Sequence, residues 1–99
     1  MSVLIAVKVA GDVAKFRGSL TERADEYSAI SERAKQASAI HHRFGIGPDF
    51  VLIVDEWEQA EQFQAFFGSP ELQEFVGSVG GSGAPEITVT EAVSSSSDF

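Results

Sequence analysis

The chain has 99 residues, a formal net charge of −8 and no cysteine. Its seven Lys and Arg residues form no basic footprint, so neither nucleic acid nor an anionic membrane is expected as a partner. Disulfides and thiolate chemistry are excluded, and the apolar start at residues 3–7 is too short for a signal peptide or a membrane span. We expect one cytoplasmic domain over residues 1–93, followed by a polar tail over residues 94–99.

The first part of the chain predicts a strand and a long helix. Residues 2–10 place alternate aliphatic side chains on one face of a strand, and Leu4 and Ala6 make most of its other face apolar. A strand that is apolar on both faces is expected to be covered on both faces. Asp12 is suited to cap the next element, where apolar residues at spacings of three and four predict one amphipathic helix over residues 13–37.

A hairpin is predicted next. Strands over residues 39–44 and 50–57 are joined by Gly-Ile-Gly-Pro-Asp, whose glycine and proline content is typical of a tight connection. The second of these strands ends in two carboxylates and the only tryptophan of the chain. The two strands are therefore expected to lie antiparallel as neighbours in one sheet.

Two short helices and a last strand complete the chain. A helix over residues 58–67 is stopped by Gly68, and another begins with Ser69 as its cap and Pro70 at its first position. A glycine-rich loop then leads to a strand over residues 86–93. The resulting order, β-α-β-β-α-β, is that of an α+β ferredoxin-like domain, in which helices cover one face of a four-stranded antiparallel sheet.

The second face of this sheet would remain apolar in a monomer. It carries Leu4, Ala6 and one of two alternating pairs from the third strand, either Val51 and Ile53 or Leu52 and Val54. Exposure of a continuous apolar face is unfavourable for a soluble protein. Two sheets packed face to face would bury it, so we expect a homodimer.

Several stretches resemble one known family. They are Asp55-Glu56-Trp57 at the end of the third strand, the phenylalanine-rich helix after it, Ser69-Pro70-Glu71-Leu72, and the final strand entered through Pro85. Together they resemble the antibiotic biosynthesis monooxygenase-like family of the dimeric α+β barrel superfamily. The resemblance implies a homodimer with a pocket in each subunit between sheet and helices. Some members oxygenate aromatic polyketides or quinols without metal or flavin, and others degrade haem.

Cofactor-free oxygenation requires an apolar pocket, a proton acceptor and a group that stabilises the developing anion. The catalytic candidates are His42, His41 and Arg43, and the substrate-binding candidates are Trp57, Tyr27, Phe63 and Phe67. Because side chains alternate along a strand, His41 and Arg43 share one face and His42 lies on the other, so only one histidine can face the pocket. No cofactor is expected, and two adjacent histidines without gathered carboxylates do not make a metal site.

Each candidate also has a purely structural interpretation. Trp57 is either a core residue that holds the next helix or a side chain that flanks a substrate ring, and Tyr27 lies on the apolar stripe of its helix.

The relatives that form quinones or degrade haem use a pocket asparagine, and this chain contains none. The haem-degrading relatives also place a histidine where this sequence has residues 73–76 (Gln-Glu-Phe-Val), which disfavours haem.

Three hypotheses for the function follow. The first is a small cofactor-independent monooxygenase acting on aromatic, polyketide-like or quinol compounds. The second is a non-catalytic dimer that binds an apolar metabolite or a partner. The third is a rearrangement or cyclisation enzyme on the same scaffold, whose turnover would depend on histidine but not on oxygen.

Overall fold

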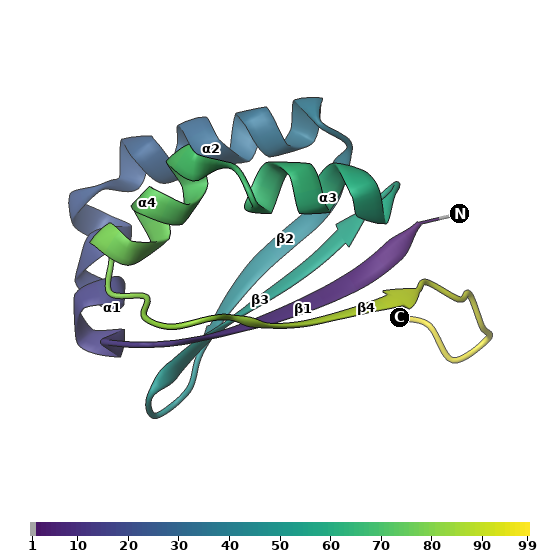
Figure 1. Cartoon of the computed structure of the whole chain (residues 1–99). Coiled ribbons are helices and arrows are strands. Elements are labelled where there is room, and N and C mark those ends of the chain that lie inside the picture. The colour runs from purple at the N-terminus through teal and green to yellow at the C-terminus, as the bar shows by residue number, and fades with distance from the viewer. Residues whose placement is uncertain (1) are drawn as a thin grey trace.

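A computed structural model describes residues 2–99 of the chain (Figure 1). Its elements, in chain order, are β1 (Val3–Ala10), α1 (Val13–Glu22), α2 (Ala24–Gln36), β2 (Ala39–Ile46), β3 (Phe50–Trp57), α3 (Ala60–Phe67), α4 (Pro70–Ser78) and β4 (Glu86–Glu91). The four strands form one antiparallel sheet in the order β2-β3-β1-β4. The predicted ferredoxin-like α+β fold is confirmed, and each crossover consists of two helices. Within residues 2–99, no helix is both long and apolar enough to cross a membrane.

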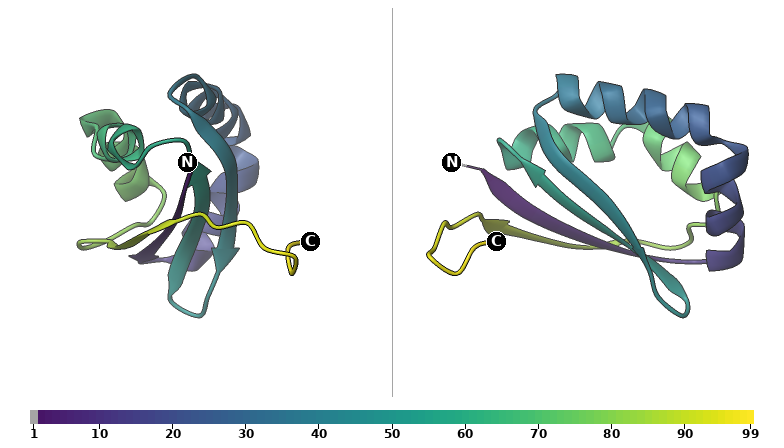
Figure 2. Two further views of the ribbon diagram at one scale, coloured as in Figure 1. Left: turned by 90° about the vertical axis from the view of Figure 1, so that its right-hand side faces the viewer. Right: turned by 180° about the vertical axis from the view of Figure 1, so that it is seen from behind.

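The helices pack on one face of the sheet as two pairs, α1 with α2 and α3 with α4 (Figure 2). On this face β1 contributes Ile5, Val7 and Val9, which are buried. The register places Ile53 opposite Val7 and Val51 opposite Val9, so these two residues of β3 also face the helices. Leu52 and Val54 therefore belong to the other face, which decides between the two alternating pairs.

The prediction of a single helix over residues 13–37 is wrong. The chain leaves helical geometry at Arg23 (φ −120°, ψ 32°), so that α1 stands at one end of the sheet and α2 runs along it (Figure 2). No glycine or proline marks the break. The Arg23 guanidinium instead bonds to the Glu26 carboxylate and, at 2.7 Å, to the Ser78 hydroxyl of α4, and it lies 4.5 Å from the centre of the Phe75 ring. These contacts fix Arg23 at the junction of three helices, and such tertiary contacts commonly override local helix propensity.

The helix end predicted at Gly68 and the helix start predicted at Ser69 and Pro70 are confirmed. Helix α3 ends at Gly68, and α4 begins with Pro70 behind the Ser69 N-cap, whose hydroxyl accepts a hydrogen bond from the Leu72 amide. In the hairpin, the Gly47 amide bonds to the Phe50 carbonyl, and a side chain at Gly47 would collide with the Phe50 ring. A side chain at Gly47 would therefore require the Phe50 ring to shift.

The last strand is shorter than predicted. It ends at Glu91 rather than at Val93, because its neighbour in the sheet, β1, begins at Val3. The pairing ends with a bond from the Ala92 amide to the Ser2 carbonyl. The helices do not cover β4, and Ile87 and Val89 remain exposed although they point to the same side as the core residues of β1.

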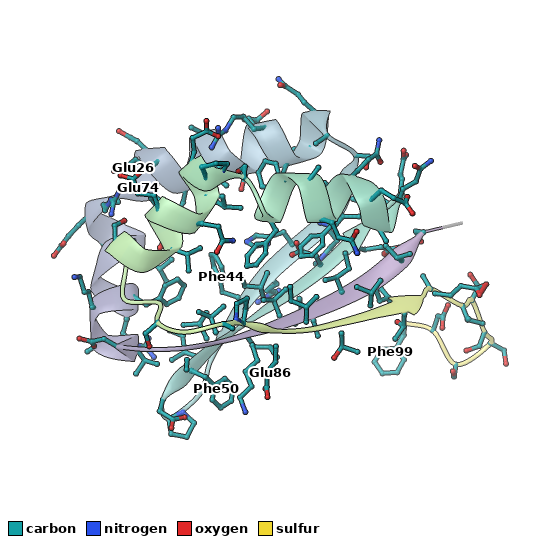
Figure 3. The ribbon with its side chains drawn as sticks, in the orientation of Figure 1. Glu26, Phe44, Phe50, Glu74, Glu86 and Phe99 are labelled. Carbon is teal, nitrogen blue, oxygen red and sulfur yellow. The ribbon has the colours of Figure 1, made fainter. Side chains whose placement is uncertain are left out.

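The face of the sheet away from the helices is uncovered in the single chain. Leu4 is 46% exposed and Val54 is 45% exposed. Figure 3 shows Phe50 and Glu86 on this side, whereas Phe44 lies between the sheet and the helices. The Lys8 amine lies 4.5 Å from the centre of the Phe50 ring, a distance typical of a cation–π contact. The open face is thus aliphatic along β1 and β3, and it also carries charged residues, among them Lys8, Arg43 and Glu86.

Candidate active site

A cavity of about 440 Å³ lies between the helix-facing side of the sheet and the helices. This volume is within the range of pockets that bind small molecules. Strands β1, β2 and β3 form its floor and the two helix pairs form its walls, which are mostly aliphatic and aromatic. Apolar residues of α3 and α4 line the cavity, among them Phe63, Phe67 and Leu72.

Two aromatic clusters border the cavity towards opposite ends of the sheet. The tyrosine cluster consists of Phe16, Tyr27, Phe44 and Phe75, with ring centres 5.0 to 6.3 Å apart in edge-to-face contacts. The tryptophan cluster consists of Trp57, Phe63, Phe66 and Phe67, with ring centres 5.4 to 5.7 Å apart. Flat faces and edges at these spacings suit the binding of another aromatic ring.

A group of three side chains that includes Trp57 of the tryptophan cluster carries the polar contacts of the site. The Asp55 carboxylate is only 7% exposed, and its two oxygens have different partners. Oδ1 lies 2.7 Å from His42 Nδ1, and Oδ2 accepts a hydrogen bond of 3.0 Å from the indole nitrogen of Trp57. We call these residues the His-Asp-Trp group. Both carboxylate oxygens are bonded, which satisfies the condition for keeping a charge in an apolar surrounding.

Strand geometry explains how the group forms. Asp55 and Trp57 are two residues apart on β3 and therefore point to the same face. The hairpin register sets His42 of β2 directly opposite Asp55. His42 stands on the edge strand with its side chain 39% exposed, and its ring packs edge-to-face against Phe44 at 4.6 Å. The histidine is thus accessible while its carboxylate partner is buried.

The hydrogen-bond roles within the group are fixed by its chemistry. An ionised carboxylate only accepts hydrogen bonds, so His42 Nδ1 must carry the hydrogen that joins it to Asp55. In the neutral ring, Nε2 then carries a lone pair. No residue between 2 and 99 forms a hydrogen bond with Nε2, and the ring borders the cavity. The site therefore presents a proton acceptor to whatever occupies the cavity.

The structure brings only one of the three predicted catalytic residues into this group. Arg43 lies opposite Val54, on the face away from the helices, and does not border the cavity. His41 lies opposite Glu56, although the β-bulge between Ala39 and His41 disturbs the alternation and lets His41 border the cavity as well. His42 alone combines a cavity position with a carboxylate partner.

The predicted substrate-binding residues all border the cavity, but Tyr27 does so with its ring. Its hydroxyl lies 2.7 Å from Ser19 Oγ, and that serine in turn donates to the Phe16 carbonyl at 2.6 Å. The tyrosine is consequently the donor to Ser19. Burial raises the pKa of the Tyr27 phenol above its ordinary value, with the Ser19 bond acting in the opposite direction. Trp57, Phe63 and Phe67 are buried cavity residues of the tryptophan cluster.

Sequence reasoning missed Asp55. In the sequence, Asp55 stood out only as part of the stretch Asp55-Glu56-Trp57, with no role of its own. The signal was present in the spacing, because Asp55 is two residues from Trp57 and the hairpin pairs it with His42. Among residues 2–99 there is no group of three or more His, Cys, Asp or Glu side chains arranged to hold a metal ion.

Compared by sequence, the chain matches no family model and no curated protein. Its fold, however, matches solved structures. A monooxygenase from the gene ActVA-Orf6 of Streptomyces coelicolor, solved in complex with the ligand nanaomycin D, aligns with a TM-score of 0.68 over 95% of this chain and 89% of that chain, at 19% identity.

Two further solved structures agree. A putative antibiotic biosynthesis monooxygenase from Nitrosomonas europaea aligns with a TM-score of 0.65 over 93% of this chain and 90% of that one, at 6% identity. SnoaB, a cofactor-independent oxygenase from Streptomyces nogalater, aligns with a TM-score of 0.58 over 98% of both chains, at 9% identity. At these identities the likeness establishes the fold. The chain therefore has the fold of antibiotic biosynthesis monooxygenase-like structures, as the resemblance in its sequence implied.

Proposed function

We propose that this protein is a cofactor-independent monooxygenase that acts on a flat, hydroxylated aromatic compound of the polyketide or quinol type. The observation that carries the proposal is the His42–Asp55 pair, which places a proton acceptor on the wall of a mainly apolar cavity. The fold shared with SnoaB, a cofactor-independent oxygenase, supports the same reaction class.

The proposed reaction begins with the transfer of a substrate hydroxyl proton to His42 Nε2. The resulting phenolate or enolate is electron-rich and can donate an electron to dioxygen. In an anthrone, one oxygen atom then replaces the two hydrogens of the ring methylene to form a carbonyl, and the other leaves as water. In a naphthalene-diol, one oxygen atom enters a ring C–H bond, the two hydroxyl hydrogens are lost as the ring becomes a hydroxyquinone, and the other oxygen atom leaves as water. In both cases the substrate supplies all four electrons. Asp55 stabilises the imidazolium that forms, because a buried carboxylate favours the charged histidine beside it.

The apolar surroundings contribute to this chemistry in two ways. The two aromatic clusters hold the ring between faces and edges, and the scarcity of polar groups in the cavity strengthens the attraction between the new anion and the imidazolium. Since the chain has no asparagine, the imidazolium of His42 takes the part of the amide that related enzymes use for the anion.

Oxygen uptake tests the proposal. An anthrone and a naphthalene-diol are supplied to the purified protein under an oxygen electrode, with the spontaneous rate subtracted. We expect enzyme-dependent uptake that falls by about 100-fold or more in His42→Ala, the usual effect of losing a general base. The same change at His41, which lies opposite Glu56, is expected to retain most of the rate. Uptake that is absent across such compounds, or equal in both variants, would contradict the proposal.

A non-catalytic role in binding an apolar metabolite is the second candidate. It is favoured by the absence of asparagine and by a cavity whose few polar side chains bond mainly to one another. In that case an aromatic ligand would raise the melting temperature, while His42→Ala would leave its affinity nearly unchanged and no oxygen would be consumed.

We also propose that the protein is a homodimer joined through the open face of the sheet. The support is the exposure of Leu4 and Val54 at the centre of that face, where Ala6 and Leu52 extend the apolar surface. Sedimentation velocity at micromolar concentration is expected to show a species of twice the chain mass. A compact monomer under those conditions would contradict this arrangement.

A further inference from the structure

The indole of Trp57 restricts what Asp55 can do. An indole N–H is a donor only, and Trp57 is 1% exposed, with Phe63 and Phe66 packed against it at 5.7 and 5.5 Å between ring centres. This packing holds the indole in place, with its N–H donating to Oδ2 of Asp55. The other oxygen, Oδ1, faces His42.

This arrangement determines the hydrogen-bonding polarity of the cavity. We infer that Asp55 and Trp57 are positioning residues that hold the hydrogen of His42 on Nδ1, an inference that rests on the proposed function. The site therefore selects neutral aromatic ligands that donate a hydroxyl hydrogen to Nε2. Phenols and enols belong to this class. Ketones of the same shape lack the donor, and carboxylates carry a charge.

The charges around the cavity favour the same selection. Three carboxylates border it, those of Asp12, Glu32 and Asp55, whereas Lys35 is the single Lys or Arg residue that does so among residues 2–99. The Lys35 amine is already paired with Glu32 at 3.3 Å. An anionic ligand would thus find no free cation, and it would meet the negative charge of Asp55 behind His42.

The same geometry predicts that Asp55→Asn inverts the preference. The new amide has one oxygen and one NH₂ group. Because the Trp57 indole can only donate, the amide oxygen must turn to Trp57 and the NH₂ group to His42. His42 Nδ1 then becomes an acceptor and its hydrogen moves to Nε2, which now donates into the cavity. The nearly isosteric change Asp55→Asn would thus convert His42 Nε2 from a hydrogen-bond acceptor into a donor.

Calorimetry with three matched probes tests the inference on the full chain at about pH 8. The probes are 2-naphthol, 2-acetonaphthone and 2-naphthoate. The wild type is expected to bind 2-naphthol about three- to tenfold more tightly than the ketone, the value of one neutral hydrogen bond, and 2-naphthoate more weakly still. In Asp55→Asn the ketone is expected to bind more tightly than the naphthol.

The double variant Trp57→Phe/Asp55→Asn is the matched control. Without the indole donor the amide is free to rotate, so the preference for the ketone is expected to shrink or vanish. Nitrogen-15 spectra of the histidine rings, assigned with His41→Gln, are expected to show the Nδ1–H form of His42 in the wild type and the Nε2–H form in Asp55→Asn. If a variant does not fold, the spectrum of the wild type still tests the predicted Nδ1–H form of His42.

The outcomes separate this inference from the proposed function. An Nε2–H ring in the wild type, or equal affinity for 2-naphthol and 2-naphthoate, would overturn the inference whether or not oxygen is consumed. Selective binding of 2-naphthol together with an absence of oxygen uptake would support the inference while removing the oxygenase.

Discussion

The two faces of the sheet differ in polarity, although strand β3 contributes residues to both. Along β3, Asp55 and Trp57 point to the helices, and Leu52 and Val54 point away from them. The inner face keeps a charged group in apolar surroundings, and every polar atom of Asp55 is bonded there. The outer face leaves aliphatic side chains open to water. The inner face thus retains polarity where packing alone would favour an apolar residue, and the outer face retains apolar residues where water would favour polar ones.

This difference indicates where each face obtains its stability. The inner face is covered by helices of the same chain, except where side chains border the cavity. The outer face becomes favourable only when another surface covers it, since an apolar patch of this kind marks an interaction site on soluble proteins. Changes on the inner face should therefore alter the stability of the fold and ligand binding, and changes on the outer face should alter association.

The largest expected effect is at the centre of the inner face. Trp57→Ala removes the indole that packs against Phe63 and Phe66, and is expected to lower the free energy of unfolding by about 3 to 5 kcal/mol. Urea denaturation followed by circular dichroism measures this change. Phe99→Ala, at a fully exposed aromatic, is the matched control and should leave the midpoint unchanged. Similar losses in both variants would mean that the tryptophan cluster is not the core of the inner face.

On the outer face, Val54→Lys is expected to weaken self-association without unfolding the chain. Lysine at the centre of a two-fold interface would bury like charges against each other, and we expect the dimer dissociation constant to rise by at least about tenfold to a hundredfold. Sedimentation equilibrium over a range of concentrations provides the measurement. Val93→Lys, which lies beyond the end of β4 and is 75% exposed, is the control. An unchanged dimer in Val54→Lys would place the interface elsewhere.

A smaller effect separates the two functions of Asp55. Asp55→Ala leaves the buried Trp57 N–H without an acceptor and is expected to cost about 1 to 3 kcal/mol. Asp55→Asn keeps an acceptor for the indole, so it should cost clearly less, even though it alters the hydrogen bonding of His42. Thermal and urea unfolding of both variants would show the ranking. If Asp55→Asn were as destabilising as Asp55→Ala, the charge itself would matter more to the fold than the bond to Trp57.

The smallest effect concerns pH. Because burial raises the pKa of Tyr27 in the folded chain, the phenol retains its proton more strongly when folded than when unfolded. Its contribution to stability is therefore complete below about pH 10, the unfolded value for tyrosine, and is lost as pH rises through the higher folded value. Tyr27 is the only tyrosine, so tyrosinate absorbance reports its titration directly. Relative to the wild type, Tyr27→Phe should lose stability less steeply above pH 10, and parallel curves would argue against this coupling.

Local signals predicted much of the fold. Asp12, Ser69 and Pro70 marked helix starts, Gly68 marked a helix end, and the Gly-Pro segment fixed the hairpin, since each acts through its own backbone geometry or through bonds to nearby amides. The break at Arg23 was not predictable in this way. It depends on Ser78, which is 55 residues away in the sequence.

The candidate site likewise combines features that follow from local sequence with features that depend on distant residues. Alternation indicated that His41 and His42 point to opposite faces but left open which of them faces the cavity, and the β-bulge before His41 lets both border it. The carboxylate partner of His42 required the pairing register as well, because the relation of His42 to Asp55 exists only across two strands. Sequence reasoning also treated Tyr27 as a single candidate, whereas its hydroxyl and its ring have separate roles, which only the contact with Ser19 reveals.

The junction at Arg23 also has a consequence for the kinetics of folding. Its bond to Ser78 joins segments 55 residues apart, so it can form only after both helix pairs have docked on the sheet. We expect this contact to form after the folding transition state, so that its loss accelerates unfolding more than it slows folding. In stopped-flow measurements, Arg23→Ala should steepen neither limb of the chevron but should shift its unfolding limb upward. The helix break that local sequence did not predict would then limit how long the folded chain persists, rather than how quickly it is reached.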